Sequence, residues 1–158
     1  MGAWLAGSLV MWFVATQNFR TVDRVLARPT PGAAPVLRSL PAETPRPLLR
    51  HLASELNRVY FVAWGLFQIP LGVAVLGLMA WSRRRAEALL AAAMLALVVL
   101  LLFGVTPQIV SLGRSLDFVP RNPPPPQMST FWRLHAAYTG LDLVKVLLGS
   151  ILACRLAR

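Results

Sequence analysis

The chain has 158 residues, of which 56% are hydrophobic and only 14% are charged, and its mean hydropathy is +0.59. A soluble domain of this length carries about a quarter charged residues and could not hide this much apolar surface in one core, so the composition favours the bilayer as the solvent. The formal net charge of +10 would indicate nucleic acid in a soluble protein, but most arginines here flank apolar runs and meet lipid head groups, so no nucleic-acid partner is expected.

Four apolar stretches approach or exceed the length that crosses about 30 Å of hydrocarbon at about 1.5 Å per residue. They cover residues of about 2–19, 59–81, 88–106 and 134–154. We therefore predict a single all-α domain, an integral membrane four-helix bundle with both termini on one side and two long proline-rich loops on the other.

The first span begins at the N-terminus, where a signal peptide is the alternative. No basic residue precedes the apolar run and no convincing small-x-small cleavage site follows it, so we expect a retained helix. The sequence FRTVDRVLAR continues the helical pattern until Pro29 ends it.

The first long connection contains the proline-rich runs PTPGAAP and PAETPRP, which favour extended backbone. After them, Leu48, Leu52, Leu56 and Val59 recur at helical spacing. The polar side chains of this segment face away from that stripe: Arg50, His51, Ser54, Glu55 and Arg58. The pattern predicts an amphipathic helix over about 47–58, which either lies on the membrane surface or extends the second span beyond the lipid.

The second and third spans are joined by a short basic turn that contains Arg83, Arg84 and Arg85, so they must be antiparallel neighbours.

Within the second span, Pro70 predicts a kink, and Gln68 is the deepest polar group outside the fourth span. Aromatic belts at the two interfaces are the expected place for three tryptophans: Trp4, Trp81 and Trp132.

The arginines give two conflicting indications of orientation. Their number favours a cytoplasmic loop-rich side, whereas the compact triplet from Arg83 to Arg85 favours the reverse, because short loops follow the positive-inside rule best. The count places both termini outside the cytoplasm. The expected location is the bacterial cytoplasmic membrane.

Four polar side chains interrupt the fourth span. His135, Tyr138, Asp142 and Lys145 fall within an arc of about 80° on one helix face. A charge near the bilayer centre costs at least about 2.5 kcal/mol, so this face should meet other protein, with Gln68 within reach of Asp142. The face is either a self-satisfied pair that locks the bundle or a protonatable site or partner contact.

A second group of polar residues is expected at the loop-side level of the bundle. Its members are Gln17, Asn18, Arg20, Asp23, Arg58, Gln108 and Arg133. Interfacial anchoring and a functional layer are the two interpretations of this loop-side polar group.

Three short motifs carry a resemblance to a known family. They are MWFVATQNFR at the end of the first span, TPQIVSLGR after the third, and Phe131 followed after three residues by His135. In these residues the chain resembles the transmembrane protein 205-like family, small four-span membrane proteins whose biochemical role is largely undefined. The resemblance implies the same four-helix topology. The family has a small hydroxyl residue and an Asn where this chain has Tyr138 and Asp142, and it is distantly similar to membrane proteins that handle copper or haem.

Catalytic motifs do not appear in the sequence: we find no nucleophile elbow, phosphate loop, metal-binding pair of histidines or zincin motif. Neither a catalytic residue nor a metal site is therefore predicted. A haem held by two histidines would need His51 and His135, and His51 lies in the loop-side segment, so haem is not expected. A lipid or pigment bound on the helix faces is the ligand that the composition allows.

Nearly featureless spans and proline-rich arms are suited to packing against a neighbour. The leading interpretation is a non-catalytic accessory subunit of a larger membrane complex, in an energy-converting or electron-transfer assembly. Its partners would be membrane lipids and other membrane-protein subunits. The alternative is a small transporter, or a proton- or cation-handling protein, that uses the face with His135, Asp142 and Lys145.

Overall fold

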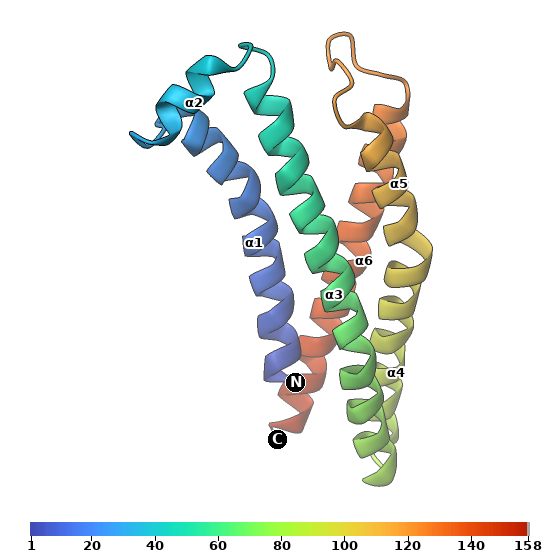
Figure 1. Ribbon diagram of the computed structural model, residues 1–158. Coiled ribbons are helices and arrows are strands. Elements are labelled where there is room, and N and C mark those ends of the chain that lie inside the picture. Colours follow the sequence, from blue (N-terminus) through green and yellow to red (C-terminus); the bar gives the residue numbers. More distant parts are fainter. Residues whose placement is uncertain (158) are drawn as a thin grey trace.

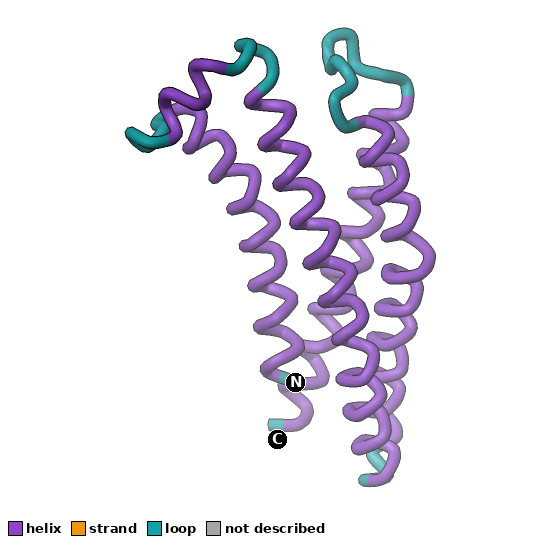
Figure 2. Tube along the Cα trace, in the orientation of Figure 1, coloured by secondary structure: helices purple, strands orange, loops and turns teal. Residues whose placement is uncertain are grey.

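The computed structural model describes residues 1–157, and every regular element in this part of the chain is a helix, as predicted (Figure 2). The elements are α1 (Gly2–Ala27), α2 (Ala33–Ser39), α3 (Pro45–Trp81), α4 (Arg85–Val99), the π-helix η1 (Leu100–Val105), α5 (Thr106–Leu116) and α6 (Gln127–Leu156). Since α4, η1 and α5 follow one another without a break, the molecule consists of four long helical rods and the short α2.

Each rod runs antiparallel to the next rod along the chain (Figure 1). Both chain termini and the tight turn between α3 and α4 lie at one end, which we call the terminal end. The two long connections, from α1 to α3 and from α5 to α6, lie at the other, which we call the loop end (Figure 1). This is the predicted distribution of termini and loops.

Three helices are long and apolar enough to cross a membrane: Pro45–Trp81, Arg85–Leu116 and Gln127–Leu156. These correspond to the second, third and fourth predicted spans. Helix α1 is not among them although it has 26 residues, because Gly and Ser residues dilute its apolar part and Gln17 and Asn18 end it. Its crossing of the membrane stays a prediction.

Helix α3 contains both the predicted amphipathic segment and the second predicted span. The predicted amphipathic segment, about 47–58, and the second span, 59–81, form one helix of 37 residues that also runs through Pro70. At about 1.5 Å per residue it is roughly 55 Å long, far more than the hydrocarbon needs. Because the predicted amphipathic segment continues the second span as one helix, the structure favours the alternative in which it extends that span over the one in which it lies along a membrane surface.

The third rod continues past the predicted end of its span at Thr106, as far as Leu116. Pro107 lacks an N–H, so the preceding turn cannot close with ordinary α-helical bonds and widens into η1. The N–H of Thr106 reaches the carbonyl of Leu101, and the side-chain amide of Gln108 donates to the carbonyl of Gly104 at 2.8 Å. These bonds keep the helix intact across the proline.

The first long connection is not wholly extended, contrary to the expectation from its prolines. Helix α2 forms within it, and Pro35 occupies the first turn of that helix. A proline is tolerated there because first-turn N–H groups have no partner within the helix. The second long connection, from Asp117 to Pro126, has no helix.

The best-buried apolar side chains lie near the terminal end and come from α1, α4 and α6. They are Trp4, Ala91, Met94, Val98 and Leu152. Close approach of α1 and α3 depends on Gly7, since a Cβ there would lie 2.1 Å from the indole ring of Trp64. Small residues of this kind bring helices together where water supplies no hydrophobic driving force.

Candidate functional site

Two clusters of polar side chains connect the rods, one in the middle of the bundle and one at the loop end. The first, which we call the buried polar cluster, consists of Trp4, Trp12, Gln68, Asp142 and Lys145. It joins α1, α3 and α6. Asp142 is 4% and Lys145 only 2% exposed, so neither charge meets the surroundings of the bundle.

Every charged group of the buried polar cluster has more than one hydrogen-bond partner. Lys145 Nζ donates to Asp142 Oδ1 and to Gln68 Oε1, the latter at 2.7 Å. Trp4 Nε1 also donates to Gln68 Oε1 at 2.7 Å, and Trp12 Nε1 donates to Asp142 Oδ2 at 2.7 Å. Because a buried charge is tolerated only when it is paired and hydrogen-bonded, this arrangement explains how the apolar fourth span retains both charges.

Helical spacing brings these side chains to one place. Asp142 and Lys145 are three residues apart on α6, and Trp4 and Trp12 are eight residues, or just over two turns, apart on α1. Ser8 lies midway between the tryptophans and is 2% exposed, but its Oγ has no hydrogen-bond partner among residues 1–157. The bundle thus buries one hydroxyl without any visible compensation.

A small cavity adjoins the cluster on the side of η1. Its volume is about 10 Å³, and its lining includes Gln68, Thr106, Tyr138 and Lys145. A space of this size holds about one water molecule. Tyr138 is half-buried here, and its ring meets the ring of Phe61 edge-on at 5.7 Å between centroids. The cavity leaves no room for a substrate beside the ion pair.

His135 does not share the position of the other polar residues of the fourth span. It is exposed, and its ring lies against those of Phe131 and Trp132, with centroid distances of 6.0 and 5.9 Å. His135 lies on the same face of α6 as Asp142. However, α1 and α3 diverge from α5 and α6 towards the loop end (Figure 1). The face is therefore covered at Asp142 and open at His135.

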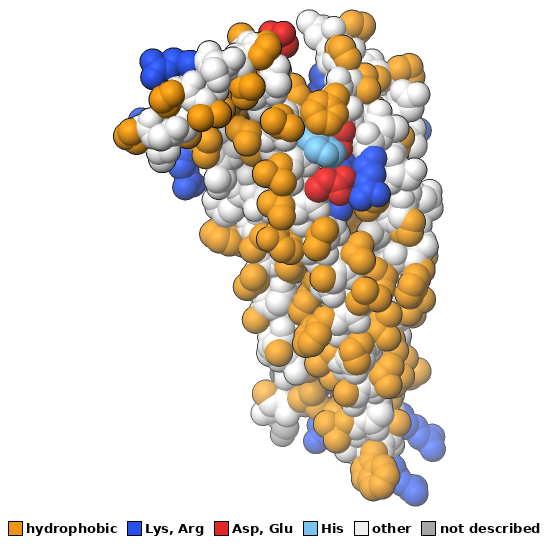
Figure 3. Space-filling view, viewed as in Figure 1, with side chains coloured by type: hydrophobic (Ala, Val, Ile, Leu, Met, Phe, Trp, Pro, Cys, Tyr) orange, Lys and Arg blue, Asp and Glu red, His pale blue; other side chains and the backbone are white. Residues whose placement is uncertain are grey.

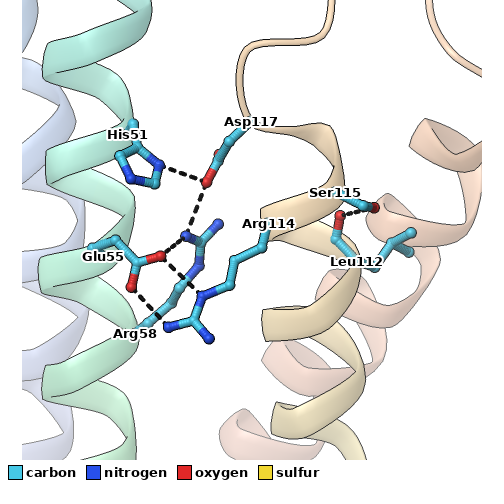
Figure 4. A network of polar contacts seen from close by, with 7 residues as sticks. All are labelled: His51, Glu55, Arg58, Leu112, Arg114, Ser115 and Asp117. Atoms are coloured by element: carbon cyan, nitrogen blue, oxygen red, sulfur yellow. Dashed lines mark hydrogen bonds and ion pairs between the residues drawn. The ribbon is translucent and has the colours of Figure 1, made fainter.

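The second cluster, which we call the loop-end ion-pair cluster, bridges α3 to the end of α5 (Figure 4). Its members are His51, Glu55, Arg58, Arg114 and Asp117. Arg58 Nη1 donates to Asp117 Oδ2 at 2.9 Å and to Glu55 Oε1 at 2.5 Å. Arg114 makes two bonds of 3.0 Å to the Glu55 carboxylate, and His51 Nδ1 lies 2.8 Å from Asp117 Oδ2. Two guanidinium groups thus balance two carboxylates.

Glu55 is held in its ionised form. Glu55 precedes the apolar part of α3, and the pKa of its carboxyl is lowered to about 2. The hydrogen bond from Arg114 is the largest cause of the lowered pKa, Arg58 lowers it as well, and desolvation opposes both effects. The ion pairs of Glu55 with Arg58 and Arg114 therefore persist over the whole physiological pH range.

Three members of this cluster have the atoms that a divalent cation would need. Ligand atoms of His51, Glu55 and Asp117 all lie within 4.8 Å of one another. However, Arg58 donates from one nitrogen to both Glu55 and Asp117. Its guanidinium therefore takes the position between the carboxylates where a cation would bind, and the geometry favours an ion-pair network over a metal centre.

The predicted loop-side polar group does not form a single site. Asn18 Nδ2 donates to Asn57 Oδ1 at 2.6 Å, Asp23 pairs with Arg46 at 2.8 Å, and Arg58 belongs to the ion-pair cluster. Gln108 bonds its own helix, as described above. Of the remaining members, Gln17 is half-buried, and Arg20 and Arg133 are exposed.

Several site residues escaped the sequence analysis. The assignment of Trp4 to an aromatic belt is wrong, because it is 1% exposed and donates to Gln68. Its spacing from Trp12 was the signal that could have placed both on the inward face of α1. The polar face of α3 was predicted only to lie opposite the leucine stripe. That His51 and Glu55 on this face reach towards α5 was not predicted (Figure 4).

Comparisons of the chain with protein-family models, with curated proteins and with solved structures found no match. The class of the protein therefore rests on its own features. Every regular element of residues 1–157 is a helix, and three helices are long and apolar enough to cross a membrane. Two polar clusters, each paired within the chain, connect the helices.

Proposed function

We propose that this protein is a non-catalytic integral membrane protein with four crossings, which acts as an accessory subunit of a larger membrane complex. The observation that carries the proposal is an apolar stripe on the first part of α3. Leu48, Leu52 and Leu56 are 48%, 55% and 39% exposed. They lie on the part of α3 that extends beyond the hydrocarbon, where neither lipid tails nor the rest of this chain covers them. Apolar side chains gathered in this way at a surface in contact with water are typical of a protein contact.

The polar side chains support the same proposal. Both polar clusters are satisfied within the chain, and the cavity beside Lys145 holds about one water molecule. Figure 3 shows hydrophobic side chains along the visible face and basic side chains mainly towards the two ends. A molecule with this distribution is suited to packing among lipids and other helices.

The alternative, a small transporter or a proton- or cation-handling protein, has less support. It would use His135, Asp142 and Lys145, but His135 is exposed and apart from the other two, which bond each other. Membership of the transmembrane protein 205-like family and a place in the bacterial cytoplasmic membrane remain part of the proposal, as does the absence of catalytic activity, haem and metal.

A photo-crosslinking pair tests the proposal. A benzophenone amino acid replaces Leu52 in one variant and Leu147 in the other, two leucines of nearly equal exposure, 55% and 54%. We expect the probe at 52 to crosslink in native membranes to one defined protein that also co-purifies in stoichiometric amount in mild detergent. The probe at 147, on the apolar part of α6, should crosslink mainly to lipid. A protein that is monomeric in mild detergent and gives no protein adduct at 52 would contradict the proposal.

A further inference from the structure

An open cavity lies between α1, α2 and α3 at the loop end, and we call it the α2 groove. Its volume is about 620 Å³, and it is open on one side. Leu26, Leu37 and Pro45 are among its apolar lining residues, and Arg38 and Arg46 lie at its polar edge. Cavities of a few hundred cubic ångströms with this mixed lining are the usual size of small-molecule sites.

The charges around the α2 groove are strongly unbalanced. Residues 20–50 contain six arginines and two acidic residues, Asp23 and Glu43. Arg38 has no carboxylate partner within residues 1–157, and only its Nε is engaged, by the carbonyl of Ala34 at 3.2 Å. Arg46 pairs with Asp23, but both side chains of that pair are more than half exposed, so the guanidinium is free to change partners at little cost. The groove therefore presents two guanidinium groups to an anion.

The groove lies at the outer edge of the lipid head-group layer. Arg20 is the first charged residue after the apolar part of α1, and Leu26 lies six residues, or about 9 Å, beyond it. The head-group layer adds roughly 5 to 8 Å on each side of the hydrocarbon. Extended arginine side chains at the groove would thus reach the phosphates, as basic residues beside a membrane span do.

We propose that the α2 groove binds the head group of an anionic phospholipid, with Arg38 and Arg46 on the phosphate and the apolar wall formed by Leu26, Leu37 and Pro45 against the carbon atoms of that head group. Guanidinium groups suit this role because their planar fork pairs with phosphate oxygens. The inference rests on the membrane placement in the proposed function and not on the partner subunit. The proposal assigns a specific ligand to the arginine-rich segment of residues 20–50.

Native mass spectrometry of the full chain in detergent tests this proposal with dioctanoyl phosphatidylglycerol and dioctanoyl phosphatidylcholine. We expect the anionic lipid to bind several-fold more tightly than the zwitterionic one. The double variant Arg38→Gln/Arg46→Gln should bind it roughly 25-fold more weakly, because each basic residue beside an anionic surface contributes about a factor of five. The matched control Arg83→Gln/Arg121→Gln removes the same charge elsewhere and should keep the affinity.

Three results would overturn the proposal: equal binding of the two lipids by the unaltered chain, an equal loss in both double variants, or glycerol 3-phosphate alone binding as tightly as the lipid. The last result would show a site for free phosphate compounds, to which the acyl chains of a lipid contribute nothing. Both arginines are exposed, so the variants should fold normally. Since binding is measured on the isolated chain, it is independent of the co-purification result at Leu52, and the two proposals can fail separately.

Discussion

The buried polar cluster and the loop-end ion-pair cluster both pair their charged side chains within the chain, the first in the interior of the bundle and the second near its surface. Each balances its charges within the chain, with one cation and one anion in the first and two of each in the second. The buried pair is at most 6% exposed in either side chain, whereas Arg114 is 60% exposed. In a nonpolar interior, loss of one partner leaves an isolated charge, but at the surface water replaces the partner. Equal pairing of charges therefore does not mean an equal free-energy cost when a pair is broken.

Their partners differ for the same reason. In the buried cluster the remaining hydrogen-bonding capacity is filled by neutral groups, the indoles of Trp4 and Trp12 and the amide of Gln68. The loop-end cluster instead adds a second guanidinium and His51. Neutral donors and acceptors add hydrogen bonds without adding net charge, and this matters most where the dielectric is low. Both clusters connect helices that are far apart in sequence.

The largest expected effect comes from breaking the buried pair. Asp142→Asn or Lys145→Met should each lower the free energy of unfolding by about 3 to 5 kcal/mol, because each leaves an uncompensated charge, whereas the double variant should be nearly neutral. Unfolding by sodium dodecyl sulfate in mixed micelles, followed by tryptophan fluorescence, measures this cycle.

The double variant also separates two interpretations of the pair. If it recovers stability and still assembles with its partner, the pair only locks the bundle. If it folds but no longer assembles, the pair has a functional contact as well. Single variants as stable as the unaltered chain would show that Asp142 and Lys145 are not buried as the structure places them.

An intermediate effect is expected at the loop end. Arg114→Gln should cost less than about 1 kcal/mol, because its pair with Glu55 is largely exposed. About 1 M salt should remove most of that difference, but should leave the cost of Lys145→Met unchanged, since buried pairs are little screened. Equal salt sensitivity of the two variants, measured by the same unfolding assay, would contradict the distinction between the clusters.

Acid should affect the loop end in a defined window. The folded pKa of Glu55 is about 2, below its usual value of 4.5, so its contribution to stability is present above pH 4.5 and is lost as the pH falls towards 2. Arg114→Gln removes the main cause of the shift. The difference in stability between this variant and the unaltered chain should therefore shrink over that range.

Much of this architecture follows from patterns that one sequence contains. Apolar runs of sufficient length predicted the helices, and the lengths of their connections predicted which of them lie at the loop end. The burial of Asp142 and Lys145 followed from the cost of charge in an apolar segment. In each case a large free-energy term, from apolar surface or from charge, depends on residues that lie close together in the sequence. One segment of the sequence is therefore enough for the prediction.

Other features depend on where the helices separate, which no local pattern contains. His135 has the helical phase of Asp142, yet the divergence of the rods leaves it exposed. His51 and Glu55 look like a water-facing surface until the end of α5 is placed opposite them. The α1 crossing is the remaining case, because its apolar run is diluted and its partners, not its composition, would hold it in the bilayer.

The smallest expected effect concerns the hydroxyl of Ser8, which lies between Trp4 and Trp12 on α1. Ser8 is 2% exposed and its Oγ bonds no atom of residues 1–157. A buried hydroxyl without a partner costs roughly 1 to 3 kcal/mol of desolvation, so Ser8→Ala should leave stability unchanged or raise it by up to about 1 kcal/mol.

Ser150→Ala is the matched control for this prediction. Its Oγ donates to the carbonyl of Val146 at 2.9 Å on α6, so the substitution should cost a few tenths to about 1 kcal/mol. Opposite signs for the two serines, measured in the same mixed-micelle unfolding assay, are the expected result. A loss of more than about 1 kcal/mol for Ser8→Ala would mean that the hydroxyl bonds a group in the folded protein. The buried polar cluster would then extend along α1 from Trp4 through Ser8 to Trp12, and its contrast with the loop-end ion-pair cluster would be sharper still.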